Sequence, residues 1–197
     1  MPHIPKDDLM TTANLTANSY DSICVFCSAS TQVSDYYKDC ATQVGTALAK
    51  AGKRLVYGGG SRGLMGACAD AAMAAGGEVV GVIPQFLYDI EVANNNLTNL
   101  IVVEDMHNRK MEMFSRSDAI LVLPGGFGTL EEMLEVITWK QLRQHDKPII
   151  IGNINNFWDS FIAMIAQLKR EKFLHSYRED MFVIAQDVTS IMACLDT

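Results

Sequence analysis

From residue 22 onward, apolar and polar positions follow two alternating patterns along the chain. Short runs that are apolar on both faces alternate with longer segments in which apolar residues return every three or four positions. The first pattern is typical of buried parallel strands, and the second is typical of helices that pack on one side. Strands are predicted at 22–27, 54–60, 78–84, 100–104, 118–126, 147–153 and 180–187, and helices at 37–51, 63–76, 106–117, 129–144 and 155–171.

The alternation of strands and helices predicts an α/β fold, a Rossmann-like doubly wound parallel sheet covered by helices on both faces. Residues 85–99 are polar and rich in Asn, so we expect a loop there. No internal repeat or linker interrupts residues 22–197, which we interpret as a single domain. Residues 1–21 are polar and rich in Thr and Asn, which indicates a flexible N-terminal tail.

Charge and composition narrow the range of partners. The net charge of −7 argues against nucleic-acid binding, which needs a basic surface, but leaves room for a small anionic ligand. No apolar run has the length of a signal peptide core or a membrane span, and five unevenly spaced cysteines are typical of reduced thiols. We therefore expect a cytoplasmic protein without membrane contact. Cys24 and Cys27 fall inside a predicted strand and are interpreted as core residues, not as a redox or metal pair.

Ligands in doubly wound sheets bind beyond the carboxyl ends of the strands, so the loops that follow the strands matter most. One of them contains G-x-G-x-x-G at Gly58, Gly60 and Gly63. This loop follows the second predicted strand and not the first, and the next strand carries its acid, Glu78, at the wrong end for binding a ribose. A dinucleotide site is therefore disfavoured. We interpret these glycines as allowing tight packing of the helix and close approach of the backbone to a ligand.

A second glycine loop, "PGGFGTLEE", runs from the fifth predicted strand into a helix. Glycines before a helix start free backbone N–H groups for an anion, and the positive end of the helix favours one. The loop lacks the Lys-Ser/Thr ending of a nucleoside triphosphate site. Thr129 and Glu132 fit a T-x-x-E capping box with Thr129 as N-cap, which gives Glu132 a structural explanation. Glu131 would complement the helix dipole.

The two acids would repel phosphate unless cations stand nearby. Arg109 and Lys110, in "DMHNRK", lie near the end of the preceding strand and could supply the charge. Seen alone, the pair would be interpreted as an exposed helix face. The combination of glycine turn, basic pair and second acid favours a site that binds phosphate and performs chemistry.

Several motifs in order carry a family resemblance: "GVIP" and "YGGGSRGLMG" upstream, "DMHNRK", "PGGFGTLEE" and "TWKQL". From about Ile23 to Pro148, and more weakly to Arg178, the chain resembles the LOG ("lonely guy") family of cytokinin riboside 5′-monophosphate phosphoribohydrolases. Related proteins have been labelled lysine decarboxylases. The resemblance implies a Rossmann-like homodimer without a cofactor or metal. Such a protein would hydrolyse the N-glycosidic bond of N6-substituted AMP to free base and ribose 5-phosphate.

The resemblance also implies roles for individual residues. Arg109 and Glu132 would be catalytic, with Glu132 stabilising the developing positive charge on the sugar or activating water. The chain departs from the family at Ser28, where a glycine is usual, so the preferred base stays open. The residues implied to bind the substrate are Glu91, Lys110, Gly125, Gly126, Phe127, Gly128, Thr129, Leu130, Glu131 and Thr138.

Two alternatives remain open at this point. The chain could be an AMP nucleosidase of purine turnover, or a nucleotide-binding module without chemistry in which Glu132 only caps its helix. Lysine decarboxylation is disfavoured, because pyridoxal phosphate needs a Schiff-base lysine and an acidic partner for the ring nitrogen. Of the lysines near the predicted site loops, only Lys110 qualifies by position.

Overall fold

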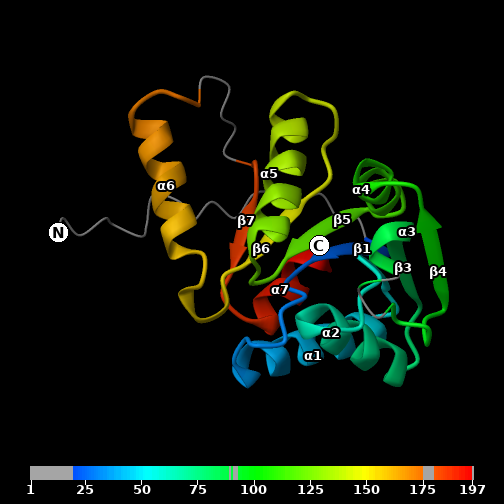
Figure 1. Ribbon diagram of the computed structural model, residues 1–197. Helices are drawn as coiled ribbons and strands as arrows, with labels where there is room; N and C mark the ends of the chain where they lie inside the picture. The colour runs from blue at the N-terminus through cyan, green and yellow to red at the C-terminus, as the bar shows by residue number, and fades with distance from the viewer. Residues whose placement is uncertain (1–19, 89, 91–92, 175–179, 197) are drawn as a thin grey trace.

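A parallel sheet forms the centre of the molecule (Figure 1). The computed structural model describes residues 20–88, 90, 93–174 and 180–196. Within these residues the sheet has seven strands in the order β4-β3-β2-β1-β5-β6-β7. The predicted fold class is confirmed. The predicted tail, residues 1–21, lies outside the described residues except for Tyr20 and Asp21.

Each predicted strand has its counterpart in the sheet. The strands are β1 (Ser22–Phe26), β2 (Arg54–Tyr57), β3 (Val79–Pro84), β4 (Asn99–Val103), β5 (Ala119–Val122), β6 (Ile149–Gly152) and β7 (Val183–Ala185). The helices are α1 (Asp35–Lys50), α2 (Gly63–Ala74), α3 (Gln85–Tyr88), α4 (Met106–Ser115), α5 (Phe127–Gln141), α6 (Asp159–Arg170) and α7 (Val188–Leu195), with a short 3-10 turn, η2 (Ile154–Asn156).

Two helices have no counterpart in the sequence prediction. The first, α3, is a single turn at the start of the predicted loop 85–99. The second, α7, is only eight residues long, and it is stabilised by a capping box in which Asp187 and Ser190 exchange hydrogen bonds. Its apolar residues Ile191 and Leu195 are buried against the core. So short a segment shows too few turns for its period to be recognised.

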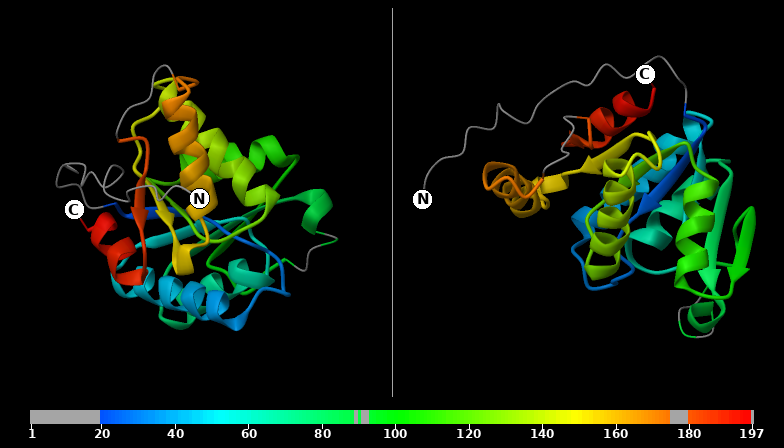
Figure 2. Two further views of the ribbon diagram at one scale, coloured as in Figure 1. Left: turned by 90° about the vertical axis from the view of Figure 1, so that its left-hand side faces the viewer. Right: turned by 90° about the horizontal axis from the view of Figure 1, so that it is seen from above.

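The two faces of the sheet carry separate hydrophobic clusters. Helices α1, α2 and α7 cover one face, while α4, α5 and α6 cover the other (Figures 1 and 2). Alternate residues of a strand point to opposite faces, so Cys24 packs in one cluster and Cys27 in the other. Both thiols are buried, and burial raises the pKa of each well above its ordinary value. The interpretation of the pair as core residues is confirmed.

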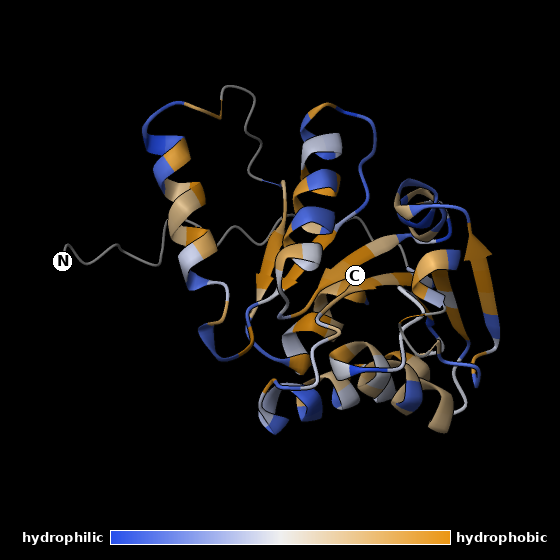
Figure 3. Cartoon of the chain, in the orientation of Figure 1, coloured by the Kyte–Doolittle hydropathy of each residue, from blue (hydrophilic) through white to orange (hydrophobic). Residues whose placement is uncertain are grey.

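Hydropathy follows this layering. In Figure 3 the strands are mostly orange, with blue at the start of β4, while most helices carry both blue and orange. None of the helices in the described part of the chain is long and apolar enough to cross a membrane. The sequence signal of apolar runs therefore corresponds to a core that is buried on both faces.

The strand order reverses at β1, which lies between β2 and β5. The chain leaves β1 and β5 at the same edge of the sheet, where the backbone N–H of Ser28 donates to the carbonyl of Pro124 at 3.2 Å. Such a switch point is where ligands bind in doubly wound folds. The fold thus brings the loop that follows β1 and the glycine loop before α5 to one place.

Candidate active site

Helix α5 begins two residues earlier than predicted. It starts at Phe127, with Gly126 as its N-cap, and no side chain caps it. The prediction that Thr129 is the N-cap of a capping box with Glu132 is therefore wrong. A T-x-x-E pattern is a local signature, but Gly126 already has the extended backbone of an N-cap, at φ −95° and ψ −151°. Glu131 and Glu132 accordingly lie in the second turn of the helix, not the first.

The early start leaves N–H groups free at the glycine loop. None of the hydrogen bonds between described residues uses the backbone N–H of Phe127, Gly128 or Thr129 as a donor. The first amides of a helix lack intrahelical partners and favour an anion. Gly126, Phe127 and Gly128 are exposed, and Thr129 is buried. The loop therefore presents an uncapped helix terminus to solvent.

Glu132 is buried, with 4% of its surface exposed. None of the hydrogen bonds or ion pairs between described residues involves its carboxylate. Burial raises the pKa of Glu132 from 4.5 to about 7, and the positive charge of Arg109 opposes part of that increase. A carboxyl group that titrates near neutral pH can both take and give a proton at physiological pH.

Arg109 is also buried, at 5% exposure, and does not lie on an exposed helix face, the interpretation that the basic pair would have had if seen alone. Its Nε donates to the carbonyl of Val82 at 3.2 Å, and its Nη2 donates to the carbonyl of Gly58 at 2.8 Å. The third contact, from Nη1, is to the sulfur of Met106 at 3.7 Å. All three acceptors are uncharged, and among the described residues no hydrogen bond or ion pair joins the guanidinium to an acid; its charge acts on the nearby carboxyl group of Glu132, whose pKa it lowers. A buried cation that shares no hydrogen bond with an acid is costly and is typical of functional sites.

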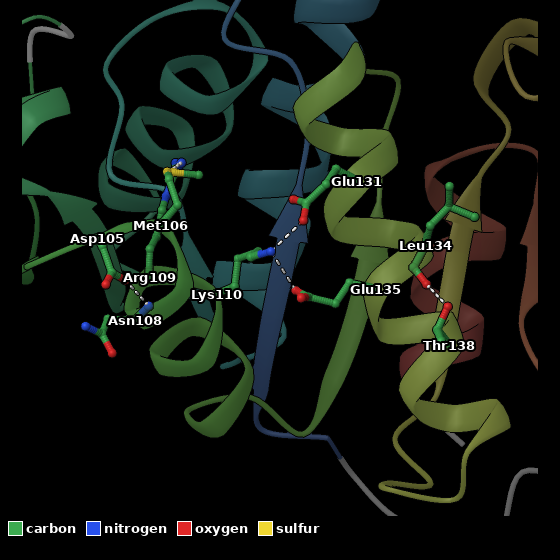
Figure 4. A network of polar contacts seen from close by, with 9 residues as sticks. All are labelled: Asp105, Met106, Asn108, Arg109, Lys110, Glu131, Leu134, Glu135 and Thr138. Carbon is green, nitrogen blue, oxygen red and sulfur yellow. Dashed lines mark hydrogen bonds and ion pairs between the residues drawn. The ribbon is translucent and has the colours of Figure 1, made fainter.

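Lys110 points away from Arg109 and toward α5 (Figure 4). Its ammonium group forms ion pairs with Glu131 and, at 3.0 Å, with Glu135. Burial alone would lower the pKa of Lys110, but the hydrogen bonds to the two glutamates outweigh burial and raise that pKa. The two basic residues therefore differ: Lys110 joins α4 to α5 through ion pairs, while Arg109 forms hydrogen bonds to neutral acceptors only.

The structure does not bring every predicted residue to this place. Thr138 lies seven residues beyond Glu131 on α5, about 10 Å along the helix. Its hydroxyl donates to the carbonyl of Leu134 at 2.7 Å (Figure 4). Leu130 is half-buried and packs against the core cluster on the α5 side of the sheet. Glu91 lies outside the described residues.

Ser28 lies in the loop that follows β1. Its hydroxyl accepts a hydrogen bond from the N–H of Ser30 at 3.1 Å, and its carbonyl accepts from Leu64 at the start of α2. The side chain thus turns back on its own loop. The glycine loop before α2 is packed tightly, since Gly63 has φ +60° and a Cβ placed on it would meet the backbone of Ala29 and Ser30. The predicted tight packing is confirmed for Gly63.

Three partners of the site residues, Glu135 and the carbonyl groups of Gly58 and Val82, were not predicted from the sequence. Glu135 stands one turn after Glu131, and this i, i+4 spacing was the available signal. The carbonyl groups of Gly58 and Val82 carry no sequence signal, because every residue has one. Two hollows elsewhere on the surface, between β4 and α4 and at the amino ends of β1, β2 and β5, include none of the predicted site residues. No group of three metal-binding side chains occurs within the described ranges.

Known structures resemble the fold. The molybdenum cofactor carrier protein of Chlamydomonas reinhardtii aligns with a TM-score of 0.65 at 22% identity, over 88% of this chain and 94% of its own. The structural genomics target TM1055 aligns with a TM-score of 0.68 at 21% identity, over 89% and 98%. At this level of identity the similarity concerns the fold alone.

Sequence relatives are closer. The family model described as "Possible lysine decarboxylase" matches residues 65–195. Cytokinin riboside 5′-monophosphate phosphoribohydrolase LOG1 of Arabidopsis thaliana is 41% identical over 91% of this chain and 84% of its own length. The probable enzyme of the same name LOGL5 of Oryza sativa subsp. japonica is 41% identical over 92% and 74%. The chain belongs to the LOG family of cytokinin riboside 5′-monophosphate phosphoribohydrolases.

Proposed function

We propose that this protein hydrolyses the N-glycosidic bond of cytokinin riboside 5′-monophosphates, releasing the free base and ribose 5-phosphate. The observation that carries the proposal is the proximity of two buried, oppositely charged groups, Glu132 on α5 and Arg109 at the ends of β2 and β3, with the charge of Arg109 lowering the pKa of Glu132. Glu132 has a pKa of about 7, and Arg109 has only neutral hydrogen-bond partners. Each group would be costly to bury if it had no task there.

The 5′-phosphate is proposed to bind at the start of α5. Support comes from the free amides of Phe127, Gly128 and Thr129 and from the helix dipole. The displacement of Glu131 and Glu132 to the second turn supports the same assignment, because it removes the repulsion expected from acids in the first turn. Binding energy from this remote phosphate can hold the ribose in position for reaction.

The chemistry at the sugar is proposed as follows. The bond between C1′ of the ribose and N9 of the purine breaks, and its electron pair leaves with the base, which takes up a proton from solvent. Water attacks C1′, and the ionised Glu132 accepts the proton that this water loses and then releases it to solvent. The carboxylate also stabilises the positive charge that develops on the sugar. Arg109 lowers the pKa of Glu132 and so favours the ionised form that accepts the proton.

Lysine decarboxylation does not fit the arrangement of the charged groups. A Schiff-base lysine must lose its proton to react. Lys110 lies between Glu131 and Glu135, which raise its pKa and keep it protonated. The family description therefore does not extend to this chain as an activity.

The test replaces Glu132 by Gln and measures release of free base from isopentenyl-AMP and from AMP. Losing a general base should lower the rate by about a hundredfold or more. Glu112→Gln is the matched control, because Glu112 pairs with Arg116 on the outside of α4, away from the site. A wild-type protein that releases base from AMP as fast as from isopentenyl-AMP would be a general AMP nucleosidase. Tight binding of AMP without turnover would refute hydrolysis and favour a binding module.

We further propose a homodimer in the cytoplasm. Apolar side chains that are exposed on α4, on α5 and just after α5 support a dimer interface. Met111, Phe127, Leu134 and Leu142 are each exposed by 40% or more. None of the five cysteines, all of which lie in the described residues, forms a disulfide, which suits a reducing compartment. Light scattering of the purified protein tests the dimer, and a monomer mass would refute it.

A further inference from the structure

Gly58, the residue directly after β2, makes room for the side chain of Arg109. A Cβ placed on Gly58 would overlap Nη2 of Arg109 and lie 2.9 Å from its Cζ and 3.4 Å from its Nε. The three nearest atoms all belong to this one guanidinium group. The space that a side chain would take at Gly58 is therefore filled by Arg109.

Other glycines of the fold are constrained in a different way. A Cβ on Gly45 or Gly66 would overlap backbone atoms of Cys68 or Ser61, and Gly63 has φ +60°. At those positions a larger residue would disturb the main chain. Gly58 does not have a positive φ, and a Cβ added to it would meet only the end of a flexible side chain. A residue with a Cβ can therefore be accommodated there if Arg109 moves.

The position of Gly58 matters because of the route that Arg109 takes. Helix α4 follows the edge strand β4, and the side chain of Arg109 reaches back across the ends of β3 and β2. There the guanidinium is held by the carbonyl of Val82 at 3.2 Å and the carbonyl of Gly58 at 2.8 Å. Neutral carbonyls fix the position of the cation without cancelling its charge. A methyl group on Gly58 would push the guanidinium off both.

We propose that Gly58 is a positioning residue, whose missing side chain seats the guanidinium of Arg109 and so fixes the cation relative to Glu132. This inference rests on the proposed function of the site, since it assigns Gly58 an effect on the reaction through Arg109. It also gives the first glycine of the loop a task that is separate from packing helix α2.

The experiment is Gly58→Ala, measured alone and together with Arg109→Ala. Misplacing a catalytic group by about 1 Å can cost about a hundredfold in rate, so a loss of that order is expected in kcat/KM. The loss should fall on kcat more than on KM, because the proposed phosphate site on α5 is untouched. In the Arg109→Ala background Gly58→Ala should cost nothing further, since the group it displaces is absent. Independent, multiplying losses would overturn the proposal.

A crystal structure of Gly58→Ala supplies a readout that needs neither activity nor a foldable Arg109→Ala variant. The guanidinium is expected to leave the carbonyl of Gly58 while the β2 backbone stays in place. A guanidinium that keeps both hydrogen bonds, with the backbone shifted instead, would overturn the proposal. If wild type releases no base at all, the proposed function fails, and this structure still decides whether Gly58 seats Arg109.

Discussion

Replacing Glu132 by Gln is expected to make the protein more stable at pH 8. Burial raises the pKa of Glu132 from 4.5 to about 7, which means that the folded protein disfavours the ionised form. A tenfold change in proton affinity corresponds to about 1.4 kcal/mol, so the ionised carboxylate lowers the free energy of unfolding by about 3 kcal/mol. Gln resembles the protonated acid in shape and carries no charge. For a chain of this length the gain corresponds to a rise in Tm of about 5–10 °C.

The sign of the stability change and the pH range in which it occurs follow from the same increase in the pKa of Glu132. A group whose pKa is higher in the folded state contributes its full stability below the unfolded value of 4.5, and loses that contribution as the pH rises through about 7. The amide introduced by Glu132→Gln does not titrate in this range. The difference in Tm between the variant and wild type should therefore be largest at pH 8 and should shrink toward zero near pH 4.5.

The assay is thermal unfolding of wild type and Glu132→Gln from pH 4.5 to pH 8 at constant ionic strength. Glu112→Gln serves as the control, because Glu112 is partly exposed and lies in an i, i+4 ion pair with Arg116. This control should lose little stability at any pH. If Glu132→Gln melts below wild type at pH 8, or if its gain is the same at every pH, then burial does not raise the pKa of Glu132 and the reasoning fails.

Two further substitutions test other parts of the structure. Lys53→Met should lower the free energy of unfolding by about 2–3 kcal/mol in chemical denaturation. The buried Nζ of Lys53 donates to the carbonyls of Tyr20 and Leu195, and these carbonyls would lose their partner. Lys50→Met, at an exposed lysine, is the control, and equal losses of stability in the two variants would contradict this account. Gly125→Ala should raise KM for the nucleotide about tenfold or more, because its Cβ would come within 2.7 Å of Cγ2 of Thr129 and shift the loop. Gly126→Ala meets nothing within 4 Å and should cost less, so a larger loss for Gly126→Ala in the same assay would refute the steric explanation.

The architecture could be predicted from the sequence alone. Runs that are apolar on both faces are typical of strands in parallel sheets, and all seven predicted runs became strands of one parallel sheet, in which the edge strands β4 and β7 are partly exposed. The glycine loops and charged motifs follow strands, so their place at one edge of the sheet could be predicted from the fold rule alone. The motifs, read in order, also indicated the family to which the chain belongs.

The environment of the charged residues depends on the folded structure and could not be predicted from local sequence. A charged helix residue is expected to be exposed, and a T-x-x-E pattern to cap a helix, because local sequence contains no information about what covers a side chain. Arg109 is buried by contacts with residues 27 and 51 positions away, Val82 and Gly58. Glu132 is buried because α5 starts at Phe127, which places this carboxylate in the second turn of a helix packed on the sheet. Burial and charge pairing depend on segments that folding brings together, and they give Glu132 a pKa suited to proton transfer.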